Sequence, residues 1–174
     1  MSIDPTLDRR EAILERLFAI GQGLNGIAGA YRNHGPTETG ILGVPRPAFL
    51  LYDGASKLIP EQADSVRRHK RPPFPPTIWR MDPQIVVLLQ NRDTVENAML
   101  DAIPAPIGPE ISGWMNLLNG MVTNDSVLVD LVTPTGSIVL TSFDTDLKVG
   151  RAVGAYGAWL MMLYEFDYPF YPPQ

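Results

Sequence analysis

A run of apolar residues close to the end of the sequence constrains the fold most. From Gly154 the residues are apolar, aromatic or glycine until Glu165. One set of alternate positions is apolar throughout, and the other is apolar for half its length and then acidic at Glu165 and Asp167. This alternation is typical of a strand inside a sheet, buried on one side and half covered on the other. We predict a strand from Gly154 to Tyr168, ended by Pro169 because proline cannot donate to a ladder; a helix of the same length is the alternative.

The composition narrows the class of protein. The chain has 174 residues, 45% of them hydrophobic, which is enough for one domain with a core. Its 19 acidic and 14 basic residues give a net charge of −5, which argues against general nucleic-acid binding. The absence of cysteine excludes disulfides and thiolate metal sites. No apolar run reaches the roughly 20 residues that span a bilayer, so no membrane partner is expected.

The rest of the pattern predicts α+β: an antiparallel or mixed β-sheet with two or three helices packed on one face, in a single domain over residues 1–174. The first helix begins at Asp4-Pro5 and ends at Gly21 and Gly23. Asp82-Pro83 is either a turn or a kink in one long strand, and 127–132 is either a short helix capped by Asp125 or a strand. The other predicted strands are 26–32, 47–52, 77–81, 84–90 and 137–143, and a second amphipathic helix covers 110–121 after an extended stretch at 102–109.

Few residues suggest catalysis. His34 and His69 stand alone in polar loops, and a zinc site needs three or four converging ligands. Asp53, Asp144 and Asp146 can form a carboxylate group for Mg²⁺ or Ca²⁺, or can each be a turn residue after a strand. No catalytic residue, metal site or cofactor is therefore predicted, and the chain is not expected to be an enzyme.

The glycines at 21–26 match the pattern GxGxxG. A dinucleotide-binding fingerprint needs a strand before the glycines and a helix after them. Here a helix is predicted before them, so we interpret the motif as the end of that helix.

The sharpest charge feature lies in a long loop at 55–76. Its basic cluster can contact phosphates, pair with an acidic patch on a partner subunit, or be solvated, and a proline-rich run holds the following residues extended. The C-terminal tip, 169–174, is also rich in proline and aromatic residues. We predict that these two arms contact a neighbour through Arg67, Arg68, His69, Lys70, Arg71, Phe74, Phe170 and Tyr171.

Several segments together carry a resemblance to a known family. They are an N-terminal helix with Arg10, Ile13 and Leu17, and the segments 26–33, 46–54, 81–88, 124–131, 134–138 and 161–168. In this layout the chain resembles the tail terminator (tail completion) proteins of long-tailed bacteriophages, which are related to head–tail joining proteins.

The resemblance implies a structural virion protein without catalysis. It implies a hexameric ring that caps the tail tube, ends its polymerisation and joins the tail to the capsid neck. The expected partners are other copies of the chain, the tail tube protein and head–tail connector proteins. DNA passes through such a ring without specific binding, and an acidic chain is suited to that. The expected location is the tail–neck junction of the virion, and the host cytoplasm during assembly.

Two alternatives remain open. One is a head–tail connector, or neck, protein on the portal side, which also needs a ring and no chemistry. The other is a small metal-dependent enzyme that uses Asp53, Asp144 and Asp146.

Overall fold

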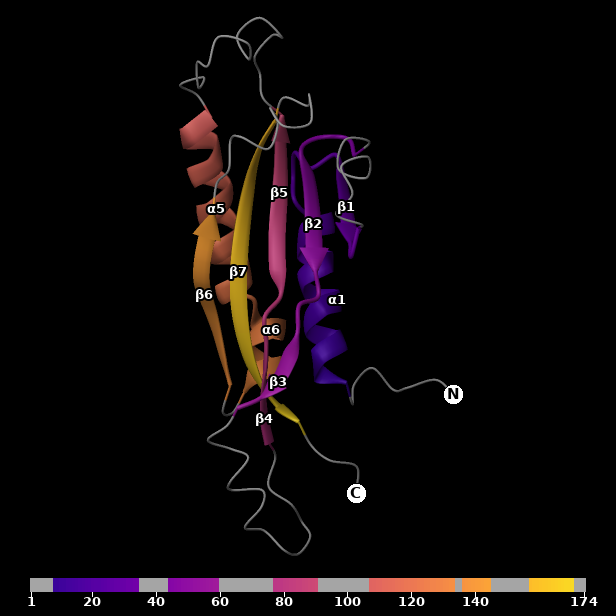
Figure 1. Ribbon diagram of the computed structural model, residues 1–174, viewed down its shortest axis with the longest axis vertical. Coiled ribbons are helices and arrows are strands. Elements are labelled where there is room, and N and C mark those ends of the chain that lie inside the picture. The colour runs from indigo at the N-terminus through magenta and orange to yellow at the C-terminus, as the bar shows by residue number, and fades with distance from the viewer. Residues whose placement is uncertain are drawn as a thin grey trace, which may run out of the picture.

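The computed structural model describes residues 8–34, 44–59, 77–90, 107–133, 136–144 and 157–170. These residues form a seven-stranded mixed sheet and three helices, which confirms the predicted α+β class. The helices α1 (Arg9–Gln22), α5 (Ile107–Thr123) and α6 (Ser126–Val132) all lie behind the sheet in Figure 1. Their apolar residues share one core with the sheet residues that face them.

The predicted C-terminal strand is confirmed as β7 (Gly157–Phe170), which lies inside the sheet. One side of β7 pairs with β5 (Gln84–Gln90) and β4 (Thr77–Met81), and the other side pairs with β6 (Ser137–Asp144). The helix-facing side is apolar and buried, as the alternation predicted. Its described buried residues are Leu160, Met162, Tyr164, Phe166 and Tyr168.

The predicted end of this strand was wrong, because β7 continues through Pro169, which pairs with Ile78 of β4. Tyr164 donates its N–H to the carbonyl of Pro83, so even-numbered residues of β7 bond to β4 and β5. The backbone nitrogen of Pro169, an odd-numbered residue, therefore points to the side of β7 on which β6 lies. There β6 begins only at Ser137, opposite Asp167. Proline costs no ladder bond at a position where no neighbouring strand is paired.

Asp82-Pro83 is a kink and not a turn. β4 and β5 lie end to end along the same side of β7, β4 beside residues 166–170 and β5 beside 157–163. At the kink, Pro83 accepts its hydrogen bond from Tyr164 with an N–O distance of 3.0 Å. Gly54 lies directly against this point with a φ of +67°, and a Cβ there would overlap the carbonyl of Asp82. Glycine is thus required by both conformation and space.

The remaining strands extend the sheet on either side. β1 (Gly29–Arg32) lies within the predicted strand 26–32. It is an edge strand that pairs in parallel with β2 (Ala48–Tyr52). β2 pairs with β5, which completes the order β1-β2-β5-β7-β4-β3. β3 (Ser56–Leu58) was not predicted, since it lies inside the stretch interpreted as a long loop.

All three helices lie where the sequence allowed a helix, but three of the predicted helix ends were wrong. α1 begins at Arg9 and not at Pro5, because the side chain of Asp8 accepts a hydrogen bond from the N–H of Glu11 and so caps the helix. α5 begins at Ile107, so Pro109 lies in its first turn, where a missing N–H costs nothing. α5 also runs past Gly120 to Thr123.

Residues 126–132 form helix α6 rather than a strand. Asp125 has extended backbone and its side chain accepts from the N–H of Leu128 at 2.9 Å. This cap satisfies a donor that the first turn leaves free. Leu128 and Val132 then point into the core.

Two clusters of buried residues lie on opposite faces of the sheet. The larger is between the sheet and the helices, with Leu17 of α1, Leu118 of α5 and Phe49 of β2 among its members. The smaller is on the other face and consists of Val44, Ala48, Leu50, Val86 and Leu88. The described part of the sheet is thus covered by helices on one face only.

Two glycines in helices predict opposite effects of the same substitution. A Cβ added at Gly21 in α1 would overlap the ring of Phe49, whereas one at Gly113 in α5 meets nothing within 4 Å. We expect Gly21→Ala to destabilise the fold by about 1–3 kcal/mol through overpacking. We expect Gly113→Ala to stabilise the monomer by about 0.5–1 kcal/mol, because alanine restricts the unfolded chain. Urea unfolding of both variants measures the two signs, and a destabilised Gly113→Ala would contradict this packing.

Candidate functional site

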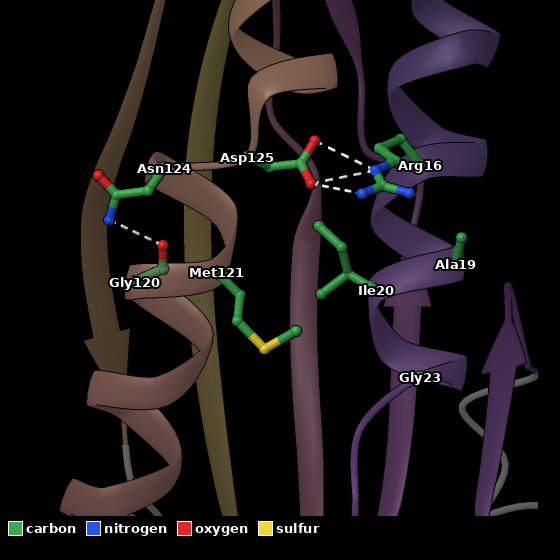
Figure 2. A pocket seen from close by; sticks show the side chains of 8 residues that line it. All are labelled: Arg16, Ala19, Ile20, Gly23, Gly120, Met121, Asn124 and Asp125. Carbon is green, nitrogen blue, oxygen red and sulfur yellow. Dashed lines mark hydrogen bonds and ion pairs between the residues drawn. The ribbon is translucent and has the colours of Figure 1, made fainter.

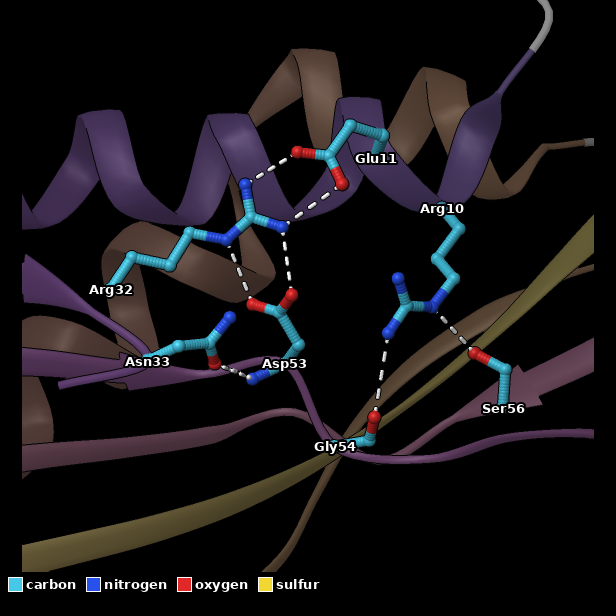
Figure 3. Close-up of polar contacts among 7 residues, drawn as sticks. All are labelled: Arg10, Glu11, Arg32, Asn33, Asp53, Gly54 and Ser56. Carbon is cyan, nitrogen blue, oxygen red and sulfur yellow. Dashed lines mark hydrogen bonds and ion pairs between the residues drawn. The ribbon is translucent and has the colours of Figure 1, made fainter. Parts of the chain in front are cut away.

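An ion-pair network joins α1 to the edge of the sheet (Figure 3). Arg32 of β1 donates to both carboxylate oxygens of Asp53, at 2.8 and 2.9 Å, and to Glu11 of α1 at 2.9 Å. Asp53 follows β2, and its N–H donates to the side chain of Asn33 at 3.1 Å. The bidentate geometry of arginine with carboxylates fixes orientation as well as distance. The network therefore holds α1, β1 and the end of β2 in one arrangement.

The charged side chains in this network form ion pairs with one another. The hydrogen bonds from Arg32 hold the pKa of Glu11 and of Asp53 below their ordinary values, against the opposing effect of partial burial. Arg10 of α1 reaches the same end of the sheet and donates to Ser56 at 2.8 Å. These contacts fit a structural role, because each carboxylate already has a cationic partner.

The structure does not bring the predicted carboxylates together. Asp53 follows β2, whereas Asp144 ends β6, and β5 and β7 lie between these strands. Three strand spacings of about 4.8 Å put the two backbones roughly 14 Å apart across the sheet. Asp146 lies outside the described residues. Asp53 and Asp144 therefore do not share one cation site, and the described residues contain no group of three or more His, Asp or Glu side chains placed for a metal.

A second arginine pair joins α1 to α6 beside a groove (Figure 2). Arg16 donates to both oxygens of Asp125, the residue that caps α6, with distances of 2.6 and 3.1 Å. This contact lowers the pKa of Asp125. The groove next to it has a volume of about 390 Å³. It lies between α1 and the end of α5, and is lined by Arg16, Ala19, Ile20, Gly23, Gly120, Met121, Asn124 and Asp125.

The groove is suited to packing rather than to chemistry. Its polar members are engaged within the fold, since Asn124 donates to the carbonyl of Gly120 at 2.9 Å and Asp125 binds Arg16. The rest of the lining is small or apolar. Such a surface binds by shape and apolar contact.

The acidic half of β7 lies on the sheet face away from the helices. Arg80 of β4 donates to Asp167 at 2.7 and 2.8 Å and forms an ion pair with Glu165 at 3.3 Å. The acidic residues thus occur in the part of β7 where the adjacent strand, β4, provides an arginine. The sequence predicted the acidic half but not its partner.

Exposed apolar side chains are the most unusual surface feature of the described residues. Two of them, Leu117 and Met121, lie on α5, where the helical spacing groups them with Ile111, Trp114 and Leu118 in one apolar stripe. Of that stripe the core takes Ile111 and Leu118, together with Val122, and leaves Leu117 and Met121 at the surface. The exposed large apolar residues are Leu117, Met121, Val127, Val129, Val139, Phe143 and Phe170, with exposed fractions from 36% to 57%.

Most of the residues predicted to contact a neighbour lie outside the described residues. These are Arg67, Arg68, His69, Lys70, Arg71, Phe74 and Tyr171. Phe170 is described; its side chain is 43% exposed and its ring centroid lies 6.0 Å from that of Trp79. Its role in a contact stays a prediction.

No protein-family model matches this chain, and no curated protein matches it at a significant level. Among the described residues, no helix is both long enough and apolar enough to cross a membrane.

The Arg32 network predicts an acid-sensitive contribution to stability. Glu11 and Asp53 have ordinary pKa values of 4.5 and 3.8, and both values are lowered by folding. Their stabilisation is complete above the ordinary values and is lost as the pH falls through the lowered ones. Asp53→Asn should therefore lower the melting temperature clearly at pH 7, and the gap to the wild type should narrow towards pH 3.

Glu15→Gln is the control for this experiment, because Glu15 is an exposed residue of the same helix. Its effect on the melting temperature should be small. A gap between Asp53→Asn and the wild type that is as wide at pH 3 as at pH 7 would contradict the assigned ion pairs.

Proposed function

We propose that this chain is a ring-forming structural protein of a long-tailed bacteriophage, of the tail terminator type. In this role copies of the chain form a hexameric ring on the end of the tail tube. The ring ends polymerisation of the tube and provides the surface that joins the tail to the neck of the capsid. The proposal assigns the chain no catalysis and no cofactor.

One observation carries the proposal beyond the resemblance: the described surface exposes large apolar side chains on several elements. Leu117 and Met121 lie one helical turn apart on α5, and Val127 and Val129 lie on the adjoining α6. Fully burying one such side chain contributes about 1.5–3 kcal/mol. A protein whose function is assembly gains that energy in its contacts, whereas a monomeric protein does not.

The character of α5 supports the same proposal. The helix has 17 residues, of which only Glu110 is charged. A Cβ added at Gly113 or Gly120 would meet no described atom within 4 Å beyond its own stretch of helix backbone. Glycine inside an exposed helix costs about 1 kcal/mol relative to alanine. A partner that approaches the backbone of α5 closely gives these positions a reason to remain small.

The runner-up is a head–tail connector on the portal side. It needs the same ring and the same apolar contacts, so the described surfaces favour neither protein. What separates the two is the tail tube, which a terminator binds and a connector does not. The enzyme alternative is weaker, since Asp53 is paired with Arg32 and lies far across the sheet from Asp144.

The test uses Leu117, which is 48% exposed. We expect the purified wild type to shorten the tubes formed by its tail tube protein, as seen by electron microscopy. Leu117→Glu places a charge in the proposed contact and should abolish capping without changing the melting temperature. Ser112→Glu is the matched control, because Ser112 is exposed on another side of α5; it should cap normally.

Two results would count against the proposal. Tubes of unchanged length with the wild type would remove the terminator function. Normal capping by Leu117→Glu would remove the exposed surface of α5 as its contact.

A further inference from the structure

The described sheet has three edge strands, and two of them, β6 and β1, lie on opposite sides of it (Figure 1). Among the described strands, β6 pairs only with β7 and β1 only with β2. An unpaired edge presents a row of N–H and C=O groups that another strand can match. β6 is notable because it has eight residues and only one of them, Asp144, is charged. By contrast the third edge strand, β3, has three residues including Lys57.

The pairing within the sheet shows which backbone groups of β6 have no partner among the described strands. Tyr164 donates to Pro83, so even-numbered residues of β7 bond to β4 and β5, and odd-numbered ones point to β6. On that side, Glu165 of β7 lies opposite Val139 of β6, and Asp167 lies opposite Ser137. The N–H and C=O groups of Ile138 and Leu140 therefore point outward.

The same reasoning applies to β1. Asn33 donates its N–H to the carbonyl of Leu51 at 2.8 Å, so odd-numbered residues of this strand bond to β2. The backbone groups of Ala30 and Arg32 therefore point outward, with the same two-residue spacing as those of β6. The guanidinium of Arg32 is paired with two carboxylates, so this edge carries no unpaired charge to repel a strand.

The strand directions make the two edges compatible. β1 is parallel to β2, and the steps from β2 to β5, from β5 to β7 and from β7 to β6 are each antiparallel. β6 therefore runs opposite to β1. If the ring axis runs roughly along the strands, the next copy presents β1 antiparallel to β6, with both helix layers on the same face of the joined sheet. The matched pairs are then Ile138 with Arg32, Leu140 with Ala30, and Val139 with Tyr31 between them.

β6 is poorly suited to pair with a second β6. A bulge between Leu140 and Ser142 breaks the regular spacing, so the next outward residue is Phe143. Two copies related by a two-fold axis can match only over the stretch before the bulge. Such a symmetric contact also closes as a dimer, whereas contacts between two different surfaces generate rings.

We propose that β6 of one copy adds to β1 of the next copy as an antiparallel pair, which joins the sheets of successive subunits. This inference rests on the proposed ring and names its contact. The two hydrogen-bonded pairs set the register, and burial of the exposed side chains of Val139 and Phe143 adds to the contact.

Disulfide trapping tests the register, because the chain has no cysteine of its own. Val139 and Tyr31 would form a non-hydrogen-bonded pair with a Cα–Cα distance of about 4.5 Å, within the range that a disulfide spans. We expect Val139→Cys combined with Tyr31→Cys to form a ladder of cross-linked oligomers on mild oxidation, resolved on a non-reducing gel and reversed by reductant. A mixture of the two single variants should stop at dimers.

Val129→Cys with Tyr31→Cys is the matched control, since Val129 is a similarly exposed valine on α6; no ladder is expected. Cross-linked dimers from Val139→Cys alone would show pairing of β6 with itself and overturn the inference. A ring seen by light scattering with no ladder would overturn the strand pairing and leave the proposed function standing. A protein that stays monomeric, alone and with its tail tube protein, would overturn both.

A second variant keeps the test decisive if Tyr31→Cys unfolds the protein. Leu140→Pro removes an N–H that points away from β7, so the β6–β7 ladder keeps its hydrogen bonds. We expect loss of the ring while cooperative thermal unfolding of the monomer is retained. A ring that persists in Leu140→Pro would overturn the pairing.

Discussion

The double pairing of β7, combined with burial of one of its faces, is the constraint on which the rest of the structure depends. β7 is the only described strand that pairs with three others, with β4 and β5 along one side and with β6 along the other. Its buried face meets all three helices through one core that includes Tyr164 and Phe166. A one-residue slip of β7 would turn its acidic residues into that core, so the register is strongly specified.

The layout of surfaces follows from this central strand. Because both sides of β7 are already paired, another strand can join the sheet only at an edge strand such as β6 or β1. Since the helices cover one face, the other face carries the small cluster around Leu50 and the ion pairs of Arg80. The Arg32 network then fixes α1 against the β1 edge, so that this edge is rigid and electrically balanced. These features suit a protein that builds an assembly from preformed surfaces.

Local patterns in the sequence were sufficient for most of the fold but not for the surfaces. β7 and β2 were predictable because alternating apolar residues and the turn at Asp53-Gly54 are local signals. The capping aspartate Asp125 pointed to α6, but the apolar residues after it left a strand equally open. β3 was missed because three residues are too few to show a period. The position of Pro169 within β7 depends on where β6 begins, which only the pairing of distant segments reveals.

The candidate surfaces were harder to predict for a similar reason. A helical wheel marks the apolar residues of α5, but it does not say which of them face the sheet, and Leu117 of that apolar stripe is exposed. The partners of Arg32 lie 21 residues away on either side in the sequence, so no local motif indicates them. The basic and proline-rich arm at 67–76 lies outside the described residues and stays a prediction.

Native mass spectrometry of the purified protein would show whether this chain assembles into a ring, as we propose. We expect a closed oligomer of about six subunits without open, incomplete forms. Head-to-tail contacts between different surfaces generate a closed ring when the rotation between neighbours closes. Adding tail tube protein is the second arm, because a ring that needs its tube as a template would appear only there. A monomer in both arms would contradict the account.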